Sequence, residues 1–597
     1  MEWPPGESGV AELRKFASAA GFKQYLADQV TAERSRNWWN IGFEAADGSL
    51  PQPSPPQVPD TSAPADGGFS TTNIQEVGVD ESDVVKNDGT YLYILGSDQV
   101  RIVRAVPADD MQLVSTVELP SQTAELYLRN DKLIALGSGH DWETHTDITT
   151  ITIVDVADRS APDLQATIEA QGSLITSRLI SSRLHLVMSM WPTLPLGERG
   201  LPVLVSNTNA LLPDITVTLG DGKSEIRNLV GWDDLYRPVD PDGYHVTAVV
   251  TLNVDAPDEP RQSVGVMANA GTVYVSTEAM YLTDTDYNHM GEIRETTDIY
   301  KFDLEENGAV PAGAGSVPGR VLNRFSLGEH QGHLRIATTI GQVSRSGEND
   351  AINNVYVLGA EKGELVIVGK VEGIAPGERI YAARFLGDRG FLVTFKKVDP
   401  LFTLDLSDPA SPRVVGELKV PGYSDYIHPL GDNHLLTIGK DAVDMGDFAW
   451  YQGVQISVFD VTEFADPQLV DAEVVGDRGT ESEALHNPHA FTFFAPVDML
   501  AVPMTIAGEA GQEPSDFGVP IFQGLCLFRV TTEEGVEPVV KIATEFVENL
   551  PHWGYWRGYD WVRGIFIGDH VYAVTSSAVY ASPLGDLGAT PQRLTLE

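Results

Sequence analysis

Short runs of β-branched and aromatic residues, separated by turn signals, fill the chain from about residue 76 to its end. One such run, 91–95, alternates Tyr, Leu and Ile and follows the turn Asn87-Asp-Gly89. Asn-Asp and Gly-Asp pairs supply the positive φ angles that tight hairpins need. This pattern predicts an all-β protein that is a sandwich, a barrel or a propeller.

An internal repeat distinguishes a propeller from the other two folds. Runs that end in an Asp-containing turn and lead at once into another strand recur at 84–88, 125–131, 383–388, 427–432 and 564–569. A second repeated run, which continues through a Pro-containing turn into one more apolar run, lies at 150–158, 401–409 and 454–462. A unit therefore holds four strands within about 45 to 55 residues, which matches a propeller blade.

First strands of these units fall near residues 82, 123, 174, 272, 325, 380, 424, 489 and 563. The count predicts a single large β-propeller of nine four-stranded blades, or of eight if the fourth or fifth unit is only half a unit. The third unit carries a long insertion at about 192–243 that is rich in Pro, Gly and Asp. Loops of that length are functional or disordered more often than idle.

The N-terminal part has a different pattern. Residues 9–31 carry apolar positions at roughly helical spacing, which predicts one or two short amphipathic helices. The Pro-, Ser-, Asp- and Gly-rich tract that follows, 45–72, reads as a linker or an extended strap. The predicted organisation is a helical segment at 1–44, a Pro-rich linker or strap at 45–75, and the propeller at 76–597.

Charge narrows the possible partners. The chain has 85 acidic and 40 basic residues and a formal net charge of −45, which repels nucleic acid and anionic lipid and favours cations.

The single cysteine, Cys526, excludes an internal disulfide framework and a Cys-based zinc cluster. No run of about 18 apolar residues predicts a transmembrane segment. Because a basic region followed by an apolar region is missing at the N-terminus, the chain is expected either to be cytosolic or to begin after a removed signal.

Several long motifs resemble a known family. They are Glu76–Tyr93, Gly377–Asp388, Val398–Pro409 and Gly422–Pro429. In this order, and over about 70–595, they resemble the secreted prokaryotic β-propeller proteins described as distantly related to WD-40 repeats. The resemblance implies a propeller and a secreted or cell-envelope location. It supplies no activity that can be carried over residue by residue.

Aromatic and charged residues recur where the predicted inner strands begin. In a propeller the inner strands line the central channel, so these residues, among them Tyr423 and Asp425, are expected to meet at one channel mouth. A pocket of aromatic residues with a few charges suits a carbohydrate, a peptide, a protein or a flat organic ligand. The other interpretation is that buried inner strands are polar because they need hydrogen-bonded side chains. The predicted ligand-binding residues are Arg379, Tyr426, Trp553, Trp556, Arg557, Trp561 and Arg563.

Two sets of residues are candidate metal ligands. Mixed nitrogen and oxygen ligands for zinc or another transition metal come from His428, His486, His489 and the acidic group Asp80, Glu81 and Asp83. Oxygen ligands with the spacing of a calcium loop come from Asp284, Asp286, Asn288 and Glu295. In this second set the expected glycine stands two positions late, at Gly291, and the alternative is a solvated acidic hairpin.

Sequence signatures of catalysis are missing: there is no Gly-x-Ser-x-Gly elbow, no His-Glu-x-x-His and no phosphate-binding loop. The first hypothesis is therefore a secreted or envelope binding module with its ligand at the channel mouth, with or without a divalent metal and with no organic cofactor. One alternative is a metal-assisted hydrolase or oxidoreductase that uses the channel-mouth histidines and carboxylates. The second alternative is a structural surface or matrix protein.

Overall fold

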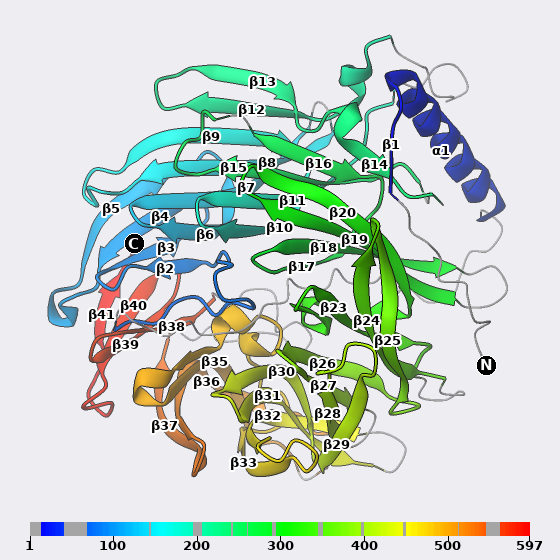
Figure 1. Ribbon diagram of the computed structural model, residues 1–597. Helices are drawn as coiled ribbons and strands as arrows, with labels where there is room; N and C mark the ends of the chain where they lie inside the picture. Colours follow the sequence, from blue (N-terminus) through cyan, green and yellow to red (C-terminus); the bar gives the residue numbers. More distant parts are fainter. Residues whose placement is uncertain are drawn as a thin grey trace.

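The computed structural model describes residues 13–40, 68–142, 145–194, 206–239, 243–259, 261–288, 294–343, 350–395, 399–445, 449–511, 513–544 and 561–596. Within these ranges, antiparallel four-stranded meanders follow one another around a ring, so that the colours of the sequence run round the molecule (Figure 1). The chain is a β-propeller, as the alternation and the repeat predict.

The meanders begin close to the positions expected from the repeat. The first three consist of β2 (Val85–Asn87), β3 (Tyr91–Leu95), β4 (Gln99–Arg104) and β5 (Gln112–Glu118); β6 (Gln122–Arg129), β7 (Lys132–Asp141), β8 (Thr146–Asp155) and β9 (Asp163–Gln171); and β10 (Ser173–Ile180), β11 (Arg183–Met190), β15 (Val246–Asn253) and β16 (Gln262–Val266). The next three consist of β17 (Thr272–Val275), β18 (Ala279–Asn288), β19 (Arg294–Glu305) and β20 (Gly308–Pro318); β22 (Leu327–His330), β23 (His333–Ile340), β24 (Ile352–Glu361) and β25 (Glu364–Ile374); and β26 (Arg379–Leu386), β27 (Arg389–Phe395), β28 (Asp399–Asp405) and β29 (Arg413–Val420). The last three consist of β30 (Tyr423–Leu430), β31 (His434–Asp444), β32 (Ala449–Asp460) and β33 (Gln468–Val475); β34 (Thr492–Phe494), β35 (Met499–Gly508), β36 (Val519–Thr531) and β37 (Gly535–Ala543); and β38 (Arg563–Ile567), β39 (His570–Val574), β40 (Ala578–Pro583) and β41 (Gln592–Thr595).

Short elements complete the connections. They are β21 (Arg320–Val321), which pairs with β23, and the 3-10 helices η1 (Ala108–Asp110), η5 (Arg324–Ser326), η6 (Glu483–Leu485), η7 (Pro488–Ala490) and η8 (Ala495–Val497). A parallel contact between Ala314 of β20 and Glu364 of β25 joins two neighbouring meanders into one sheet. The positive φ expected of the Asn-Asp and Gly-Asp turns is confirmed at Asn130, Gly387, Gly431 and Gly568.

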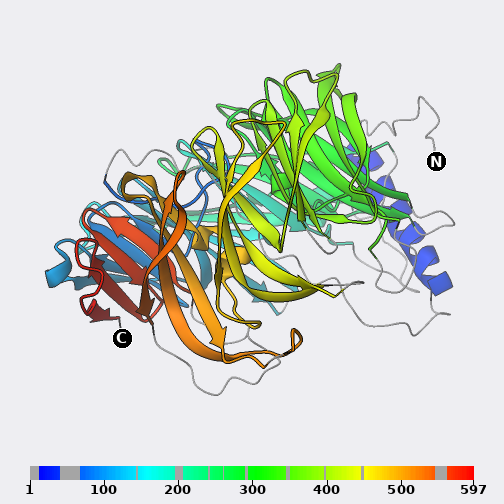
Figure 2. The same ribbon diagram turned by 90° about the horizontal axis from the view of Figure 1, so that it is seen from below.

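The insertion in the third unit extends two sheets. It contains η3 (Thr208–Leu211), β12 (Asp214–Leu219), β13 (Ser224–Asn228), η4 (Trp232–Asp234) and β14 (Leu235–Arg237). Strands β12 and β13 are added outside β9, and β14 pairs with β16 and with β1 (Arg14–Lys15). Phe22 and Leu26 of the helix α1 (Ala19–Asn40) pack into one apolar cluster with residues of this insertion, such as Ile215. The helix lies at the outer edge of the ring in both views (Figures 1 and 2).

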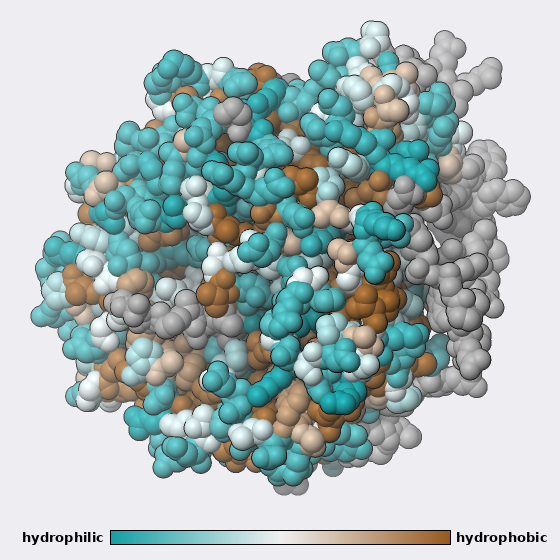
Figure 3. Space-filling model, in the orientation of Figure 1, coloured by the Kyte–Doolittle hydropathy of each residue, from teal (hydrophilic) through white to brown (hydrophobic). Residues whose placement is uncertain are grey.

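Apolar side chains pack between neighbouring meanders and so hold the ring together. Tyr93 of the first meander and Leu133 of the second share one cluster. At the other side, Ile565 and Tyr572 of the last meander share a cluster with Leu92 of the first. The same packing therefore closes the ring between its two ends. On the face shown in Figure 3, hydrophilic residues cover most of the surface, as a net charge of −45 leads one to expect.

Residues 69–83, here called the inner segment, run along the inner strands before the chain enters β2. Ser70 N–H donates to Phe566 of β38 at 2.8 Å, Asp80 N–H to Leu179 of β10 at 2.9 Å, and Asp83 N–H to Leu126 of β6 at 3.0 Å. The aromatic ring of Phe69 lies so close to the β2–β3 turn that a Cβ atom on Gly89 would stand 2.6 Å from it. The segment therefore links inner strands from opposite ends of the chain.

No helix among the described residues is long and apolar enough to cross a membrane.

Candidate functional site

Two buried arginines and a histidine surround the carboxylate of Glu81, whose side chain is 3% exposed. Arg324 donates to it at 2.8 Å, Arg178 lies 3.5 Å away, and the ring of His489 lies at 3.4 Å. Arg178 belongs to β10, whereas Arg324 and His489 belong to η5 and η7, the 3-10 helices that precede β22 and β34. A buried carboxylate is stable only with such compensation, because an unpaired charge away from water is costly.

Asp83 and Asp80 have cationic partners of the same kind. Arg563 donates from Nε to both carboxylate oxygens of Asp83, at 3.0 and 3.3 Å, and from Nη1 to Glu483 at 2.9 Å. Burial opposes the charge of Arg563, but the two carboxylates outweigh it and raise the pKa of the guanidinium. The Nζ atom of Lys86 lies 3.1 Å from Asp80 and also donates to the carbonyl of Glu81.

Polar side chains of the inner segment hold it against further inner strands. Asn73 donates to the hydroxyl of Tyr426 at 3.3 Å and to the carbonyl of Pro488 at 3.1 Å. Gln75 donates to the carbonyl of Arg324 at 3.2 Å, and Arg384 donates to the carbonyl of Gln75 at 3.1 Å. The acidic group thus belongs to a hydrogen-bonded segment inside the ring.

Of the three histidines predicted as transition-metal ligands, the structure places His489 beside Glu81 and Asp83, at 3.4 and 4.0 Å, and the other two elsewhere. His428 is buried beside Tyr426 and Phe491, with ring centroids 6.3 and 5.2 Å away, whereas His486 and His489 line two different pockets. Within the described ranges, no group of three or more His, Cys, Asp or Glu side chains is placed to hold a metal ion. A cation bound by the acidic group would have to replace the arginines and the lysine that already pair with it.

The predicted calcium ligands lie on a hairpin rather than around one point. Asp284 and Asp286 belong to β18, and Glu295 stands opposite Tyr287 in the β18–β19 register. Opposed residues share a face and successive residues lie on opposite faces, so Glu295 projects away from the two aspartates. Glu295 is buried and accepts a hydrogen bond from Arg320 at 2.7 Å. The side chain of Asn288 lies outside the described residues.

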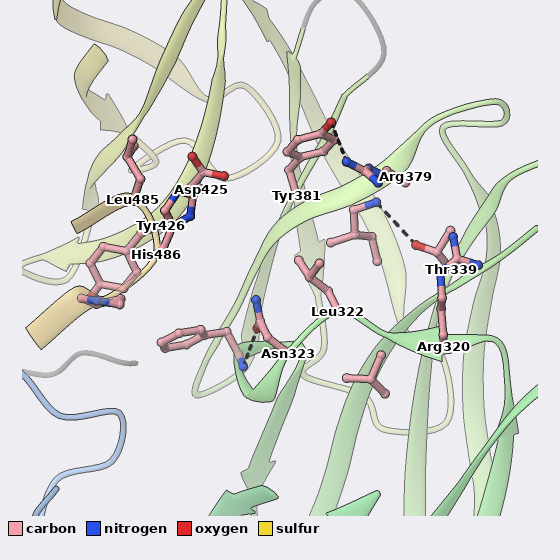
Figure 4. Close-up of a pocket in the computed structure, with 14 residues that line it drawn as sticks. Arg320, Leu322, Asn323, Thr339, Arg379, Tyr381, Asp425, Tyr426, Leu485 and His486 are labelled. Carbon is pink, nitrogen blue, oxygen red and sulfur yellow. Dashed lines mark hydrogen bonds between the residues drawn. The ribbon is translucent and has the colours of Figure 1, made fainter. Parts of the chain in front are cut away.

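A pocket of about 380 Å³, here called the entry pocket, opens where the chain enters β26 and β30 (Figure 4). Its apolar lining consists of Val321, Leu322, Phe325, Ile380, Leu485 and Pro488. Its polar lining consists of Arg320, Asn323, Thr339, Arg379, Tyr381, Asp425, Tyr426 and His486. Figure 4 shows Asp425, Leu485 and His486 together on one side of the pocket and Arg320 and Thr339 on the other.

Asp425 is the acidic residue in the lining of the entry pocket. Its Oδ2 atom is buried and has no hydrogen-bond partner among the residues that the structure describes. Burial raises the pKa of this carboxyl to about 8, although Lys440 lowers it, and Glu481 raises it further. Burial also lowers the pKa of His486. At neutral pH the pocket therefore holds a protonated carboxyl and an uncharged imidazole.

Arg379 lies at the rim of the pocket, beside a cluster of aromatic side chains. Its guanidinium stands 4.7 Å from the centroid of the Tyr381 ring, and Nη2 donates to the Tyr381 hydroxyl at 3.0 Å. Tyr381 contacts Tyr423, with ring centroids 4.8 Å apart, and its hydroxyl lies 3.2 Å from that of Tyr451. These contacts hold Tyr381 and Arg379 in place before any ligand arrives.

The remaining predicted ligand residues lie elsewhere. Arg563 and His489 line a second pocket, of about 440 Å³, that also contacts Asn130 and Ser181 in the turns at the far ends of β6 and β10. A third pocket, of about 1000 Å³, is lined by residues such as Gly431 and Phe493 at the same ends of inner strands. Trp561 packs against the apolar clusters beside the first meander. The predicted positions Trp553, Trp556 and Arg557 lie outside the described residues.

The structure brings three residues that the sequence singled out, Arg379, Tyr426 and His486, to the lining of one pocket. Asp425, which was not among the predicted ligand-binding residues, lines the same pocket. Asp425 stands among the charged residues that open an inner strand, in the run Tyr423-Ser-Asp-Tyr426. An acidic residue between two aromatic residues is the available signal, because such neighbours favour burial. The run cannot show which oxygen is left without a partner.

A family model described as "Beta propeller domain" matches residues 69–587. The chain is 29% identical over 573 residues to an uncharacterized protein of Archaeoglobus fulgidus, covering 82% of this chain and 85% of that protein. It is 28% identical over 464 residues to an uncharacterized protein of Methanocaldococcus jannaschii, covering 68% of this chain and 69% of that protein.

Solved structures that align with this chain include two proteins from Pyrococcus species. The acylaminoacyl peptidase of Pyrococcus horikoshii aligns with a TM-score of 0.29 and 11% identity, over 71% of this chain and 52% of the peptidase. The β-propeller domain of the Trilobed protease from Pyrococcus furiosus aligns with a TM-score of 0.29 and 7% identity, over 68% of this chain and 92% of that domain. This chain thus spans about half of the peptidase's length.

Proposed function

The chain belongs to the beta propeller domain family, and from this premise we propose that it is a binding module whose ligand occupies the entry pocket. The observation that carries the proposal is convergence: Arg320, Arg379, Asp425 and His486 come from segments far apart in the sequence and line one concave space of about 380 Å³. Pockets for small ligands typically measure about 300–1,000 Å³ and combine an apolar wall with a few placed polar groups.

The chemistry of the lining supports recognition of an organic ligand. Apolar side chains such as Leu322 and Ile380 offer hydrocarbon contacts, while Arg379 and Asp425 offer hydrogen bonds in fixed directions. The contacts of Arg379 with Tyr381 keep the polar groups of the rim in place, which lowers the entropy lost on binding.

A thermal-shift screen with oligosaccharides, peptides and other small organic compounds tests the proposal, because a ligand that binds the folded state raises the melting temperature. Leu322→Trp should fill the entry pocket, since Leu322 lines it and is 37% exposed. Leu469→Trp is the matched control, since Leu469 is also 37% exposed but lies on β33. We expect the stabilising ligand to act on the wild type and the control and to fail with Leu322→Trp. An equal response of both variants would disprove the entry pocket as the site.

We further propose that the protein works outside the cytoplasm or in the cell envelope and binds a divalent cation. The net charge of −45 supports the location because it favours solubility in salt, and it supports cation binding because it attracts cations. Cell fractionation with an antibody tests the location, and elemental analysis of the purified protein tests the cation. Recovery of the protein in the cytosolic fraction would contradict the proposed location. Absence of bound metal after metal-replete expression would contradict the proposed cation.

A further inference from the structure

The charges around the entry pocket leave one cation uncompensated. Arg320 pairs with Glu295 at 2.7 Å, and Lys440 pairs with Glu481 at 2.9 Å, so each of these charges has its counterion. Arg379 forms no ion pair with a carboxylate of the described ranges, and its guanidinium donates instead to the hydroxyl of Tyr381. A single free guanidinium at the rim of a concave site favours one negative charge on the ligand.

Asp425 can add a second contact to such an anion. Because burial raises its pKa to about 8, the carboxyl is mostly protonated at neutral pH and carries an O–H donor. Its Oδ2 atom is buried without a partner in the described part of the chain, so a polar ligand atom can satisfy the group. A guanidinium beside a neutral carboxyl complements a carboxylate, whereas a positively charged ligand group would meet Arg379.

The rest of the lining selects what the carboxylate is attached to. Val321, Leu322, Ile380 and Leu485 form a hydrocarbon wall in the same pocket. A uronic acid carries hydroxyl groups in most directions, and this wall would leave several of them without a partner. The C-terminal residue of a peptide places a carboxylate directly beside a single side chain. A volume of about 380 Å³ lies near the lower end of the usual range, which suits one or two residues.

We propose that the entry pocket binds the C-terminal residue of a peptide, with its carboxylate held between Arg379 and Asp425 and an apolar side chain on the wall formed by Leu322 and Ile380. This inference rests on the proposed function, because it names the ligand of the same pocket. The peptide is recognised by its free terminus and one apolar side chain, so partners of many sequences can share the site.

Isothermal titration with matched probes tests this inference. The probes are N-acetyl-Gly-Gly-Leu as the free acid, the same peptide as its C-terminal amide, and glucuronic acid. We expect the acid to bind at least about tenfold more tightly than the amide, since a charge-assisted hydrogen bond is lost in the amide. Arg379→Gln should remove this difference. Arg389→Gln should preserve it, because Arg389 lies at the other end of the same meander and donates to the carbonyl of Asp432.

Four results would overturn the inference. Equal affinity for acid and amide, or a preference that survives in Arg379→Gln, would show that the carboxylate is not the recognised group. Binding of glucuronic acid without binding of the peptide acid would exclude the peptide. If neither binds while the thermal-shift screen finds a ligand that Leu322→Trp excludes, the inference falls and the proposed function stands.

Discussion

Replacement of Glu81 by glutamine tests the ion-paired packing of the inner segment. The change keeps the shape of the side chain and removes its charge, so Arg324 and Arg178 lose the carboxylate that they share at 2.8 and 3.5 Å. Both cations are buried, with side chains 9% and 5% exposed. Removing one partner of a buried pair costs about 3–5 kcal/mol, because an uncompensated charge stays away from water.

The cost should appear as local opening of the inner segment, because this segment is held by isolated contacts rather than by a full ladder. Amide hydrogen exchange followed by mass spectrometry reads this opening directly, at the amides of Asp80 and Asp83 that donate to Leu179 and Leu126. Since about 1.4 kcal/mol corresponds to a tenfold change, a cost of about 3–5 kcal/mol should speed exchange there by about 10²- to 4 × 10³-fold in Glu81→Gln.

A matched control and a second substitution complete this test. Glu361→Gln also removes one negative charge, but Glu361 is exposed in the hairpin between β24 and β25, so exchange in the inner segment should not change. Adding Arg324→Gln to Glu81→Gln removes one of the two stranded cations and should restore part of the protection. If Glu81→Gln changes exchange by no more than the control does, the ion pairs do not hold the inner segment and the reasoning is wrong.

Three further predictions follow from single contacts. The pKa of Asp425 is raised to about 8, so between about pH 4 and pH 8 the folded state keeps a proton that the unfolded state has lost, and the stability of the wild type falls as the pH rises. Asp425→Asn should remove this fall. A melting-temperature difference between variant and wild type that does not grow over this range would contradict the prediction. Tyr572→Phe should cost about 1 kcal/mol in thermal denaturation, because the hydroxyl donates to the buried carbonyl of Ala105 where the ring closes, whereas an unchanged melting temperature would show that the contact is unimportant. Cys526 is buried and its pKa is raised to about 12, so a thiol reagent should react with it only after denaturation, and rapid labelling of the native protein would contradict this burial.

Local sequence patterns determined the architecture of this protein. Alternating apolar residues with Asn-Asp and Gly-Asp turns mark strands that pair with their neighbours in the chain, so the first strands fell close to the starts of β2, β6 and β10. Arg379 and Tyr426 meet at one pocket because β26 and β30 begin at equivalent positions of the repeat, which brings their first residues to one face of the ring. His486 reaches the same pocket from the connection between η6 and η7.

Only the tertiary structure decided which charged groups meet. Glu81 and Arg324 are 243 positions apart, and Asn73 and Tyr426 are 353 apart, and no periodicity along the chain relates such pairs. The acidic cluster in the sequence predicted Glu81 as a metal ligand, and in the folded chain Arg178 of β10 and Arg324 of η5 pair with it. The physical reason is that alternation reports which face of a strand is buried, while the partner of a buried charge depends on ring closure and on the path of the inner segment.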